Sequence, residues 1–164
     1  MRLMALSAAL VLSLATGGAG DAPQRLVGSW RLVSYEDKPA TGPSVFPYGI
    51  EPRGMLVYDA TGHMAIQIMK QPHPKVASGD EFIVTPQEKV ALVDAYVAYF
   101  GTYRVDTVKG VVVVHAEGDL YDLYIGREEV RPFELSGDRL IIKSLPWSQD
   151  GQMWTGTRVF ERIK

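Results

Sequence analysis

The chain has 164 residues, of which 46% are hydrophobic and 22% charged; this is the composition of one globular domain with a single core. Its 17 basic and 19 acidic residues give a formal net charge of -2, so we expect no cationic surface for nucleic acid or for an anionic bilayer. The chain contains no cysteine, which excludes disulfides, thiolate metal sites and cysteine nucleophiles.

The first twenty residues have the layout of a secretory signal peptide. Arg2 precedes an uncharged apolar run over residues 3–15, and small residues follow at 16–20. The apolar run is too short to span a bilayer comfortably, and no stop-transfer charges follow it. We therefore expect cleavage after Ala19 or Gly20, a secreted or periplasmic protein, and no stable membrane insertion afterwards. A buried N-terminal helix is the alternative interpretation.

Residues 21–164, the expected mature domain, form a series of short segments rich in β-branched and aromatic residues. Glycine-containing hairpin turns join several of them, at Gly62, Gly110 and Gly137. The predicted strands cover residues 28–35, 55–58, 63–69, 101–105, 111–117, 129–135, 139–143 and 155–163. A meander of eight strands closes most naturally into a barrel, so the predicted fold is an all-β, antiparallel up-and-down barrel.

One helix interrupts the strand pattern. Thr85 to Glu88 reads Thr-Pro-Gln-Glu, a capping box with proline at the first helical position. The predicted helix continues to about Tyr99, with Val90, Val93 and Val97 along one stripe. Because valine stripes usually face a core, we expect this helix to pack against the barrel wall or across one open end rather than to act as a mobile lid.

The first predicted strand carries a resemblance to a known family. Gly28-Ser29-Trp30, preceded by the apolar turn Arg-Leu-Val, resembles the lipocalin Gly-x-Trp signature. The resemblance implies that Gly28 and Trp30 are structural and that Trp30 plugs the closed end of the barrel. It also implies that an arginine of the last strand, either Arg158 or Arg162, packs over the indole ring.

Further segments extend the resemblance over nearly all of the expected mature domain. They are FPYG at 46–49, GMLVYDATGHMAIQIM at 54–69, AYFGTYRVD at 98–106, VVHAEGDLY at 113–121 and RPFELSGDRLII at 131–142. Together they are similar to the bacterial and fungal lipocalin-like domain family, a calycin-type barrel. The stretch DLYDLYIG, residues 119–126, departs from the family pattern, so the resemblance implies a barrel with a cavity and leaves the ligand open.

Polar residues within the predicted strands are the candidates for ligand contact. His115 and Glu117 share one face of their strand with valines, while Val112, Val114 and Ala116 share the other face. Both faces of a barrel strand can be apolar, so the alternation does not decide which face points inward. If the His115 face points inward, Arg131 of a later strand would converge with His115 and Glu117 on one polar patch.

The predicted ligand-binding set adds aromatic and amide residues to that patch. It consists of Tyr58, Gln67, Tyr103, His115, Glu117, Arg131 and Phe133, with Tyr48 and Phe100 as further aromatic walls. A structural role is the alternative for the polar patch, because a His-Glu-Arg cluster can satisfy itself and fix strand register. His63 and His73 lie in turn and loop segments, where we expect them to face solvent.

No sequence pattern indicates a metal or a cofactor. The three histidines, at positions 63, 73 and 115, lack the spacing of a metal site. No Gly-x-Ser-x-Gly elbow and no clustered phosphate-binding glycines occur.

Two main function classes therefore remain, and an interaction module is a third alternative. The preferred one is a binding protein that holds a small, largely hydrophobic molecule in the barrel. The alternative is a cofactor-free isomerase or cyclase, in which His115 acts as general acid or base, Glu117 orients it and Arg131 stabilises negative charge. A barrel with a filled interior would instead be an interaction module. The oligomeric state does not follow from the sequence.

Overall fold

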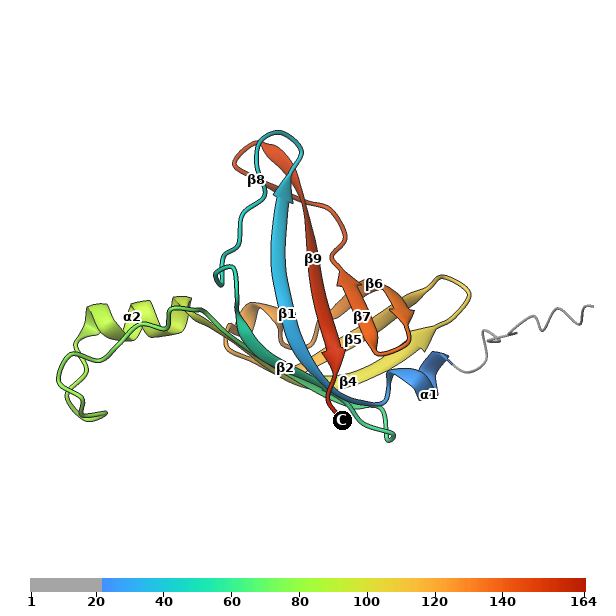
Figure 1. The fold of residues 1–164 in the computed structure, drawn as a ribbon, viewed down its shortest axis with the longest axis horizontal. Coiled ribbons are helices and arrows are strands. Elements are labelled where there is room, and N and C mark those ends of the chain that lie inside the picture. The colour runs from blue at the N-terminus through green and yellow to red at the C-terminus, as the bar shows by residue number, and fades with distance from the viewer. Residues whose placement is uncertain (1–21) are drawn as a thin grey trace, which may run out of the picture.

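The computed structural model describes residues 22–164 as one antiparallel sheet that closes on itself (Figure 1). The predicted signal peptide, residues 1–20, lies outside the described residues. The strands are β1 Gly28–Pro39, β2 Arg53–Tyr58, β3 His63–Met69, β4 Tyr96–Asp106, β5 Val111–Asp119, β6 Glu128–Ser136, β7 Arg139–Lys143, β8 Trp147–Gln149 and β9 Gln152–Arg162. Neighbouring strands pair in chain order from β1 to β7, β9 pairs with β7, and β1 pairs with β9 to complete an eight-stranded barrel. The predicted fold class is thus confirmed.

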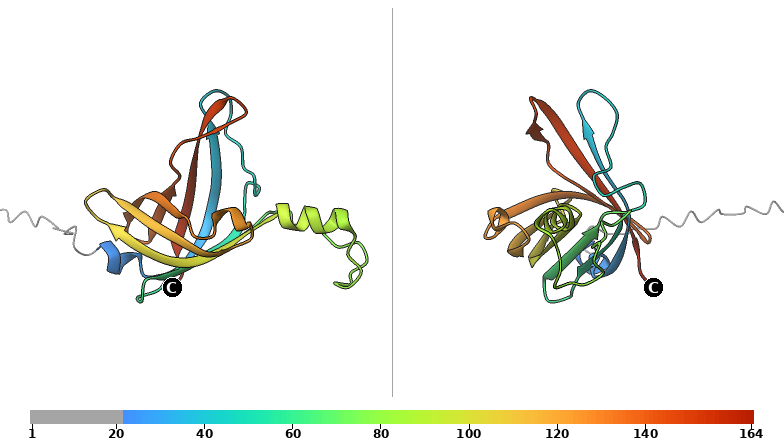
Figure 2. Two further views of the ribbon diagram at one scale, coloured as in Figure 1. Left: turned by 180° about the vertical axis from the view of Figure 1, so that it is seen from behind. Right: turned by 90° about the vertical axis from the view of Figure 1, so that its left-hand side faces the viewer.

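The strand β8 is an addition to the barrel that the sequence did not predict. Trp147 lies opposite Trp154 in the β8 to β9 hairpin, and their rings stack with centroids 6.3 Å apart. Together with the end of β1, this hairpin rises beyond the other strands (Figures 1 and 2). Three residues of mixed polarity are too short a segment for period-two alternation to reveal.

A bulge in β1 divides that strand into two halves. Leu32 lies opposite Phe160 and Ser34 opposite Val159, which leaves Val33 as an extra residue on β1. An extra residue reverses which side chains face inward beyond it. Before the bulge, Trp30 and Leu32 are buried in the core, and after it Tyr35 faces the interior.

The closed end of the barrel is packed around Trp30. The Trp30 side chain is 0% exposed, and its indole N–H donates to the Leu26 carbonyl oxygen of the short helix α1 (Ala22–Leu26) at 2.9 Å. The Arg162 guanidinium carbon lies 4.1 Å from the ring centroid, so Arg162 is the arginine that covers the plug. Arg162 also donates to the backbone carbonyls of Val27 and Arg25.

Gly28 is favoured at this closed end by its backbone conformation and by the arginine beside it. Its φ of +136° disfavours residues with a side chain, and an added Cβ would lie 2.7 Å from a guanidinium nitrogen of Arg162. In the Gly-x-Trp signature, Gly28 therefore leaves room for the Arg162 side chain, and Trp30 supplies the ring over which that side chain lies.

The helix differs from the prediction in length and in position. Helix α2 (Pro86–Asp94) begins with the expected capping box between Thr85 and Glu88, but it ends at Asp94, and β4 starts at Tyr96. The expected continuation to Tyr99 is wrong because residues 96–102 pair along the whole of β3, so sheet pairing replaces helical hydrogen bonds there. The tyrosine and valine side chains of this stretch also favour a strand.

The expected packing of the helix on the barrel is wrong as well. Helix α2 extends away from the barrel (Figure 1), and none of its residues is buried. The side chains of Val90 and Val93 are exposed. Within residues 22–164, no helix has the length and hydropathy that crossing a bilayer requires.

Candidate functional site

The barrel interior above the packed end contains two adjoining hollows. The inner one has a volume of about 100 Å³ and lies over an apolar floor that includes Leu56, Ile68 and Phe160. The outer one, of about 290 Å³, opens toward the segment that contains the 3₁₀ helix η2 (Asp122–Tyr124). Both hollows are lined by Tyr35, Val97, Tyr99 and Arg131. These four residues therefore mark the junction of the two hollows.

Arg158 and Asp37 form an ion pair on one side of the junction. An Arg158 guanidinium nitrogen lies 2.8 Å from Asp37 Oδ1, and the two side chains are only 16% and 14% exposed. The guanidinium also lies over the Tyr35 ring, 3.6 Å from its centroid, and Tyr35 packs edge-on against Tyr48. Burial raises the pKa of Asp37 more than the neighbouring Arg158 charge lowers it.

Arg131 and Glu129 form a second ion pair, on a strand that only β7 separates from β9. Both belong to β6, where residues two apart share a face, and their side chains approach to 3.0 Å. Arg131 lies opposite Val112 and Glu129 opposite Val114 on β5. Because opposed residues point to the same side of a sheet and these valines belong to the core, Arg131 and Glu129 point inward.

Tyrosine hydroxyls add to the polar groups that the two ion pairs place around the hollows. Burial raises the pKa of Tyr35, Tyr58 and Tyr99, and it raises the pKa of Tyr48 to about 12. The Arg131 charge lowers the pKa of Tyr99, and the Arg158 charge lowers the pKa of Tyr35, in each case by less than burial raises it. All four phenols are therefore protonated at neutral pH and available as hydrogen-bond donors.

These raised pKa values predict that alkali destabilises the fold. A tyrosine whose pKa is higher in the folded state than its ordinary 10.0 holds its proton more tightly when folded. Stability is therefore fully present below about pH 10 and falls as the pH rises toward the folded pKa of Tyr48 at about 12. Urea titrations at about pH 8 and about pH 11 measure this loss. Tyr48→Phe is expected to reduce it, and a pH-independent stability across this range would contradict the prediction.

The structure places His115 and Glu117 outside the barrel, which overturns the predicted polar patch. Val112, Val114 and Ala116 are buried in the interior, so the alternate residues His115 and Glu117 face outward and are exposed. Desolvating an imidazole and a carboxylate costs more than burying the valine and alanine side chains, which explains the choice of face. Arg131 pairs with Glu129 and not with Glu117, and the acid–base mechanism assigned to His115, Glu117 and Arg131 is wrong.

The other predicted ligand contacts divide between the cavity, the core and the outer surface. Tyr58 and Arg131 line the inner hollow, whereas Phe133 and Tyr103 pack against the core beside it. Gln67 faces outward, where its side-chain oxygen accepts from the Tyr96 hydroxyl at 2.9 Å. Phe100, expected as an aromatic wall, is exposed on the outer surface, so the predictions for Gln67 and Phe100 as cavity residues are wrong.

Several cavity residues were missed from the sequence, and each has an identifiable reason. Tyr35 faces inward only because of the bulge at Val33, and Tyr99 fell within the expected helix. Arg158 is one of the two arginines predicted as the cover of Trp30, but it lies over Tyr35 instead. Tyr121 and Tyr124 line the outer hollow within the stretch that departs from the family pattern, which was the available signal for them.

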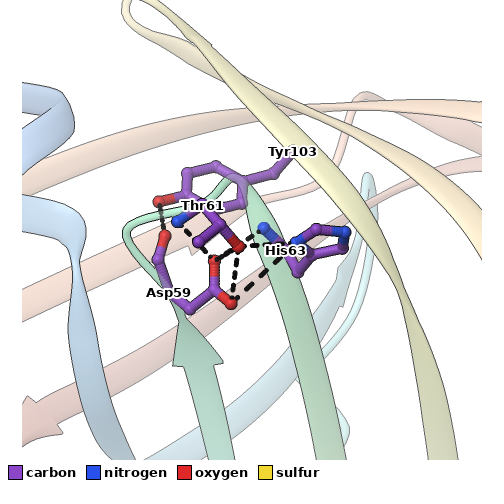
Figure 3. A network of polar contacts seen from close by, with 4 residues as sticks. All are labelled: Asp59, Thr61, His63 and Tyr103. Carbon is purple, nitrogen blue, oxygen red and sulfur yellow. Dashed lines mark hydrogen bonds and ion pairs between the residues drawn. The ribbon is translucent and has the colours of Figure 1, made fainter.

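A polar cluster on the β2 to β3 hairpin lies apart from this cavity (Figure 3). Asp59 Oδ1 accepts from the backbone N–H groups of Thr61 and His63 at 2.8 and 2.9 Å, and Thr61 Oγ1 lies 2.7 Å from His63 Nδ1. The Tyr103 hydroxyl donates to the Asp59 carbonyl at 2.8 Å. These contacts fasten an exposed turn, so His63 is a hairpin residue. Within residues 22–164, no three His, Asp or Glu side chains are grouped so as to hold a metal ion.

An up-and-down barrel with a tryptophan plug, an arginine over it and an interior cavity defines a calycin-type protein. A model of the lipocalin-like domain matches residues 27–163, and the chain belongs to this lipocalin-like family, as predicted. No curated protein matches the sequence.

Two solved structures resemble the chain in part. A lipocalin-like protein from Bacteroides uniformis is 14% identical, with a TM-score of 0.44, and the match covers 85% of this chain and 99% of that protein. Bovine odorant binding protein, solved with a selenium-containing odorant, is 18% identical with a TM-score of 0.43, and the match covers 87% of this chain and 73% of that protein.

Proposed function

We propose that this protein binds a small, largely hydrophobic molecule inside its barrel. The observation that carries this proposal is that the interior above the Trp30 plug is hollow and lined mainly by aliphatic and aromatic side chains. A filled barrel would leave no such space, which disfavours the interpretation as an interaction module. The inner and outer hollows together have a volume within the range of about 300 to 1,000 Å³ that is typical of small-molecule sites.

Dye binding to a cavity-filling variant tests the proposal. Val97 lines both hollows, so Val97→Trp is expected to fill the junction and abolish the fluorescence increase of the uncharged dye Nile red. His115→Ala, on the exposed outer face of β5, is the matched control and is expected to bind the dye as the unaltered protein does. Circular dichroism verifies that both variants fold. Equal dye binding by the two variants would place the dye outside the barrel and contradict the proposal.

We further propose that the protein acts after export. The support is the arrangement of residues 1–20, in which one positive charge, an apolar run and small residues follow in order. N-terminal sequencing of the protein recovered from its own source is expected to begin at Gly20 or Asp21. Recovery of a chain that begins at Met1 from the native source would contradict export by cleavage.

A further inference from the structure

The polar groups that face the inner hollow are mainly hydrogen-bond donors. Its lining contains the phenols of Tyr35, Tyr58 and Tyr99 and the guanidinium groups of Arg131 and Arg158, and no Asp, Glu, Asn or Gln. The Ser144 hydroxyl, a possible acceptor in that lining, already accepts from the Gly156 N–H at 2.8 Å. Lys143 also borders the hollow, but its ammonium group lies 2.6 Å from Glu134.

Two of these phenols have no acceptor in the described part of the chain. The Tyr103 hydroxyl donates to a backbone carbonyl, but no hydrogen bond from the hydroxyls of Tyr58 and Tyr99 is formed within residues 22–164. The Tyr58 residue is 2% exposed. A phenol that lines a hollow and has no hydrogen-bond partner in the described chain favours a ligand that brings an acceptor to it.

The two guanidinium groups also have N–H donors that their ion pairs do not use. Arg131 reaches Glu129 through one terminal nitrogen, at 3.0 Å. Arg158 uses one terminal nitrogen for both Asp37 and the Glu36 carbonyl, at 2.8 and 3.3 Å. A guanidinium group carries five N–H donors in a planar fork. Each arginine is therefore fixed in place by its carboxylate, and within residues 22–164 its other N–H groups have no further carboxylate or carbonyl partner.

The free donors lie at a defined depth in the barrel. Tyr35, Tyr99 and Arg131 line both hollows, so an acceptor group at the junction would reach them together. Below the junction the floor is apolar, with Leu56, Ile68 and Phe160. Above it, Leu120 and the aromatic residues Tyr48, Tyr121 and Tyr124 surround the outer hollow. Two carboxylates also line that hollow: Glu129, which is paired with Arg131, and Asp119, which accepts from the Tyr121 N–H at 2.9 Å. A matching ligand is apolar on both sides of one compact acceptor group.

We infer that the ligand of this cavity is an apolar carboxylic acid, bound as its carboxylate at the junction of the two hollows. This inference rests on the proposed binding function and specifies its ligand class. A carboxylate offers about four acceptor positions and no donor, and it matches the planar fork of an arginine. A ligand with an amine or ammonium group would instead add donors to the inner hollow, whose lining already has more donors than acceptors, and the carboxylate of Glu129 beside it is already paired with Arg131.

Three probes that share one ring system test this inference by isothermal titration calorimetry at neutral pH. They are 1-naphthoate, its methyl ester and 1-naphthylmethylammonium. Naphthoate is expected to bind on the order of tenfold more tightly than the ester, since charge-assisted hydrogen bonds are stronger than neutral ones. The ammonium probe is expected to bind most weakly. Equal binding of naphthoate and ester, or tighter binding of the ammonium probe, would overturn the carboxylate assignment.

Paired tyrosine variants locate the bound carboxylate. Tyr99→Phe removes a hydroxyl at the junction but keeps the ring, so it is expected to weaken naphthoate binding several-fold and to change the binding of Nile red much less. Tyr103→Phe removes a hydroxyl that donates to the Asp59 carbonyl. It is expected to leave the binding of naphthoate and the binding of Nile red unchanged. Equal effects of the two variants would contradict the proposed site. If Nile red binds but naphthoate does not, the ligand class is wrong; if neither binds, the proposed function itself fails.

Discussion

Trp30→Ala is expected to lower the free energy of unfolding by about 3 to 5 kcal/mol, the usual cost of truncating a buried large aromatic residue. The side chain is fully buried, its N–H is held by the Leu26 carbonyl, and Arg162 covers its ring. Alanine would leave a cavity, an unpaired carbonyl and an arginine without its aromatic partner. Urea denaturation followed by circular dichroism measures the loss.

Trp154→Ala is the matched control for that measurement. Trp154 is a half-buried residue of the β8 to β9 hairpin, where it stacks on Trp147 outside the main core. Its removal is expected to cost clearly less than the removal of Trp30, because the site is already open to water. Similar losses at both positions would show that Trp30 is not the plug of the closed end.

Arg158→Met is expected to destabilise the protein by about 3 kcal/mol at neutral pH, because it leaves the Asp37 carboxylate without its counter-charge in a largely buried site. It also removes the guanidinium group from the Tyr35 ring. Burial already raises the pKa of Asp37, and loss of the arginine is expected to raise it further. A carboxyl group with a raised pKa in the folded state does not destabilise the protein at pH values where it is protonated in both states. The free energy of unfolding falls as the pH rises from the unfolded pKa of that group through its folded pKa. The destabilisation by Arg158→Met should therefore shrink toward acidic pH.

Two further variants isolate the ion pair. Adding Asp37→Asn to Arg158→Met removes the stranded charge and is expected to restore part of the stability, as a double-mutant cycle would show. Arg31→Met breaks an exposed pair, in which Arg31 lies 2.7 Å from Glu161, and is expected to cost at most about 1 kcal/mol. Equal losses for Arg31→Met and Arg158→Met would contradict the burial argument.

The strand pattern was predictable because each strand has a local signature. All eight predicted barrel strands are present, with shifted ends, because alternation, β-branched residues and glycine turns act over a few neighbouring residues. The end of α2 was not predictable in this way. Tyr96 and the residues after it form a strand because they pair with β3, which comes much earlier in the chain.

The site was predictable only where one face of a strand was clearly distinct. Tyr58 and Arg131 were placed in the cavity, as the structure has them. In β5, where both Val112 and Val113 are buried, alternation could not distinguish inside from outside, and His115 was misplaced. The bulge at Val33 has no sequence signal of its own, so Tyr35 was missed, although it lines both hollows.

The bulge at Val33 makes the two ends of β1 independent in evolution and in design. Residues on the closed-end side of Val33, such as Trp30, are fixed by the register with Arg162, whereas residues beyond it follow a separate register that begins at Ser34. Deleting Val33 would remove the extra residue and leave both registers as they are, because Leu32 would still lie opposite Phe160, Ser34 opposite Val159 and Tyr35 opposite Arg158. Removing this one residue would thus straighten β1 without altering either the tryptophan plug or the side chains that the open half presents to the cavity.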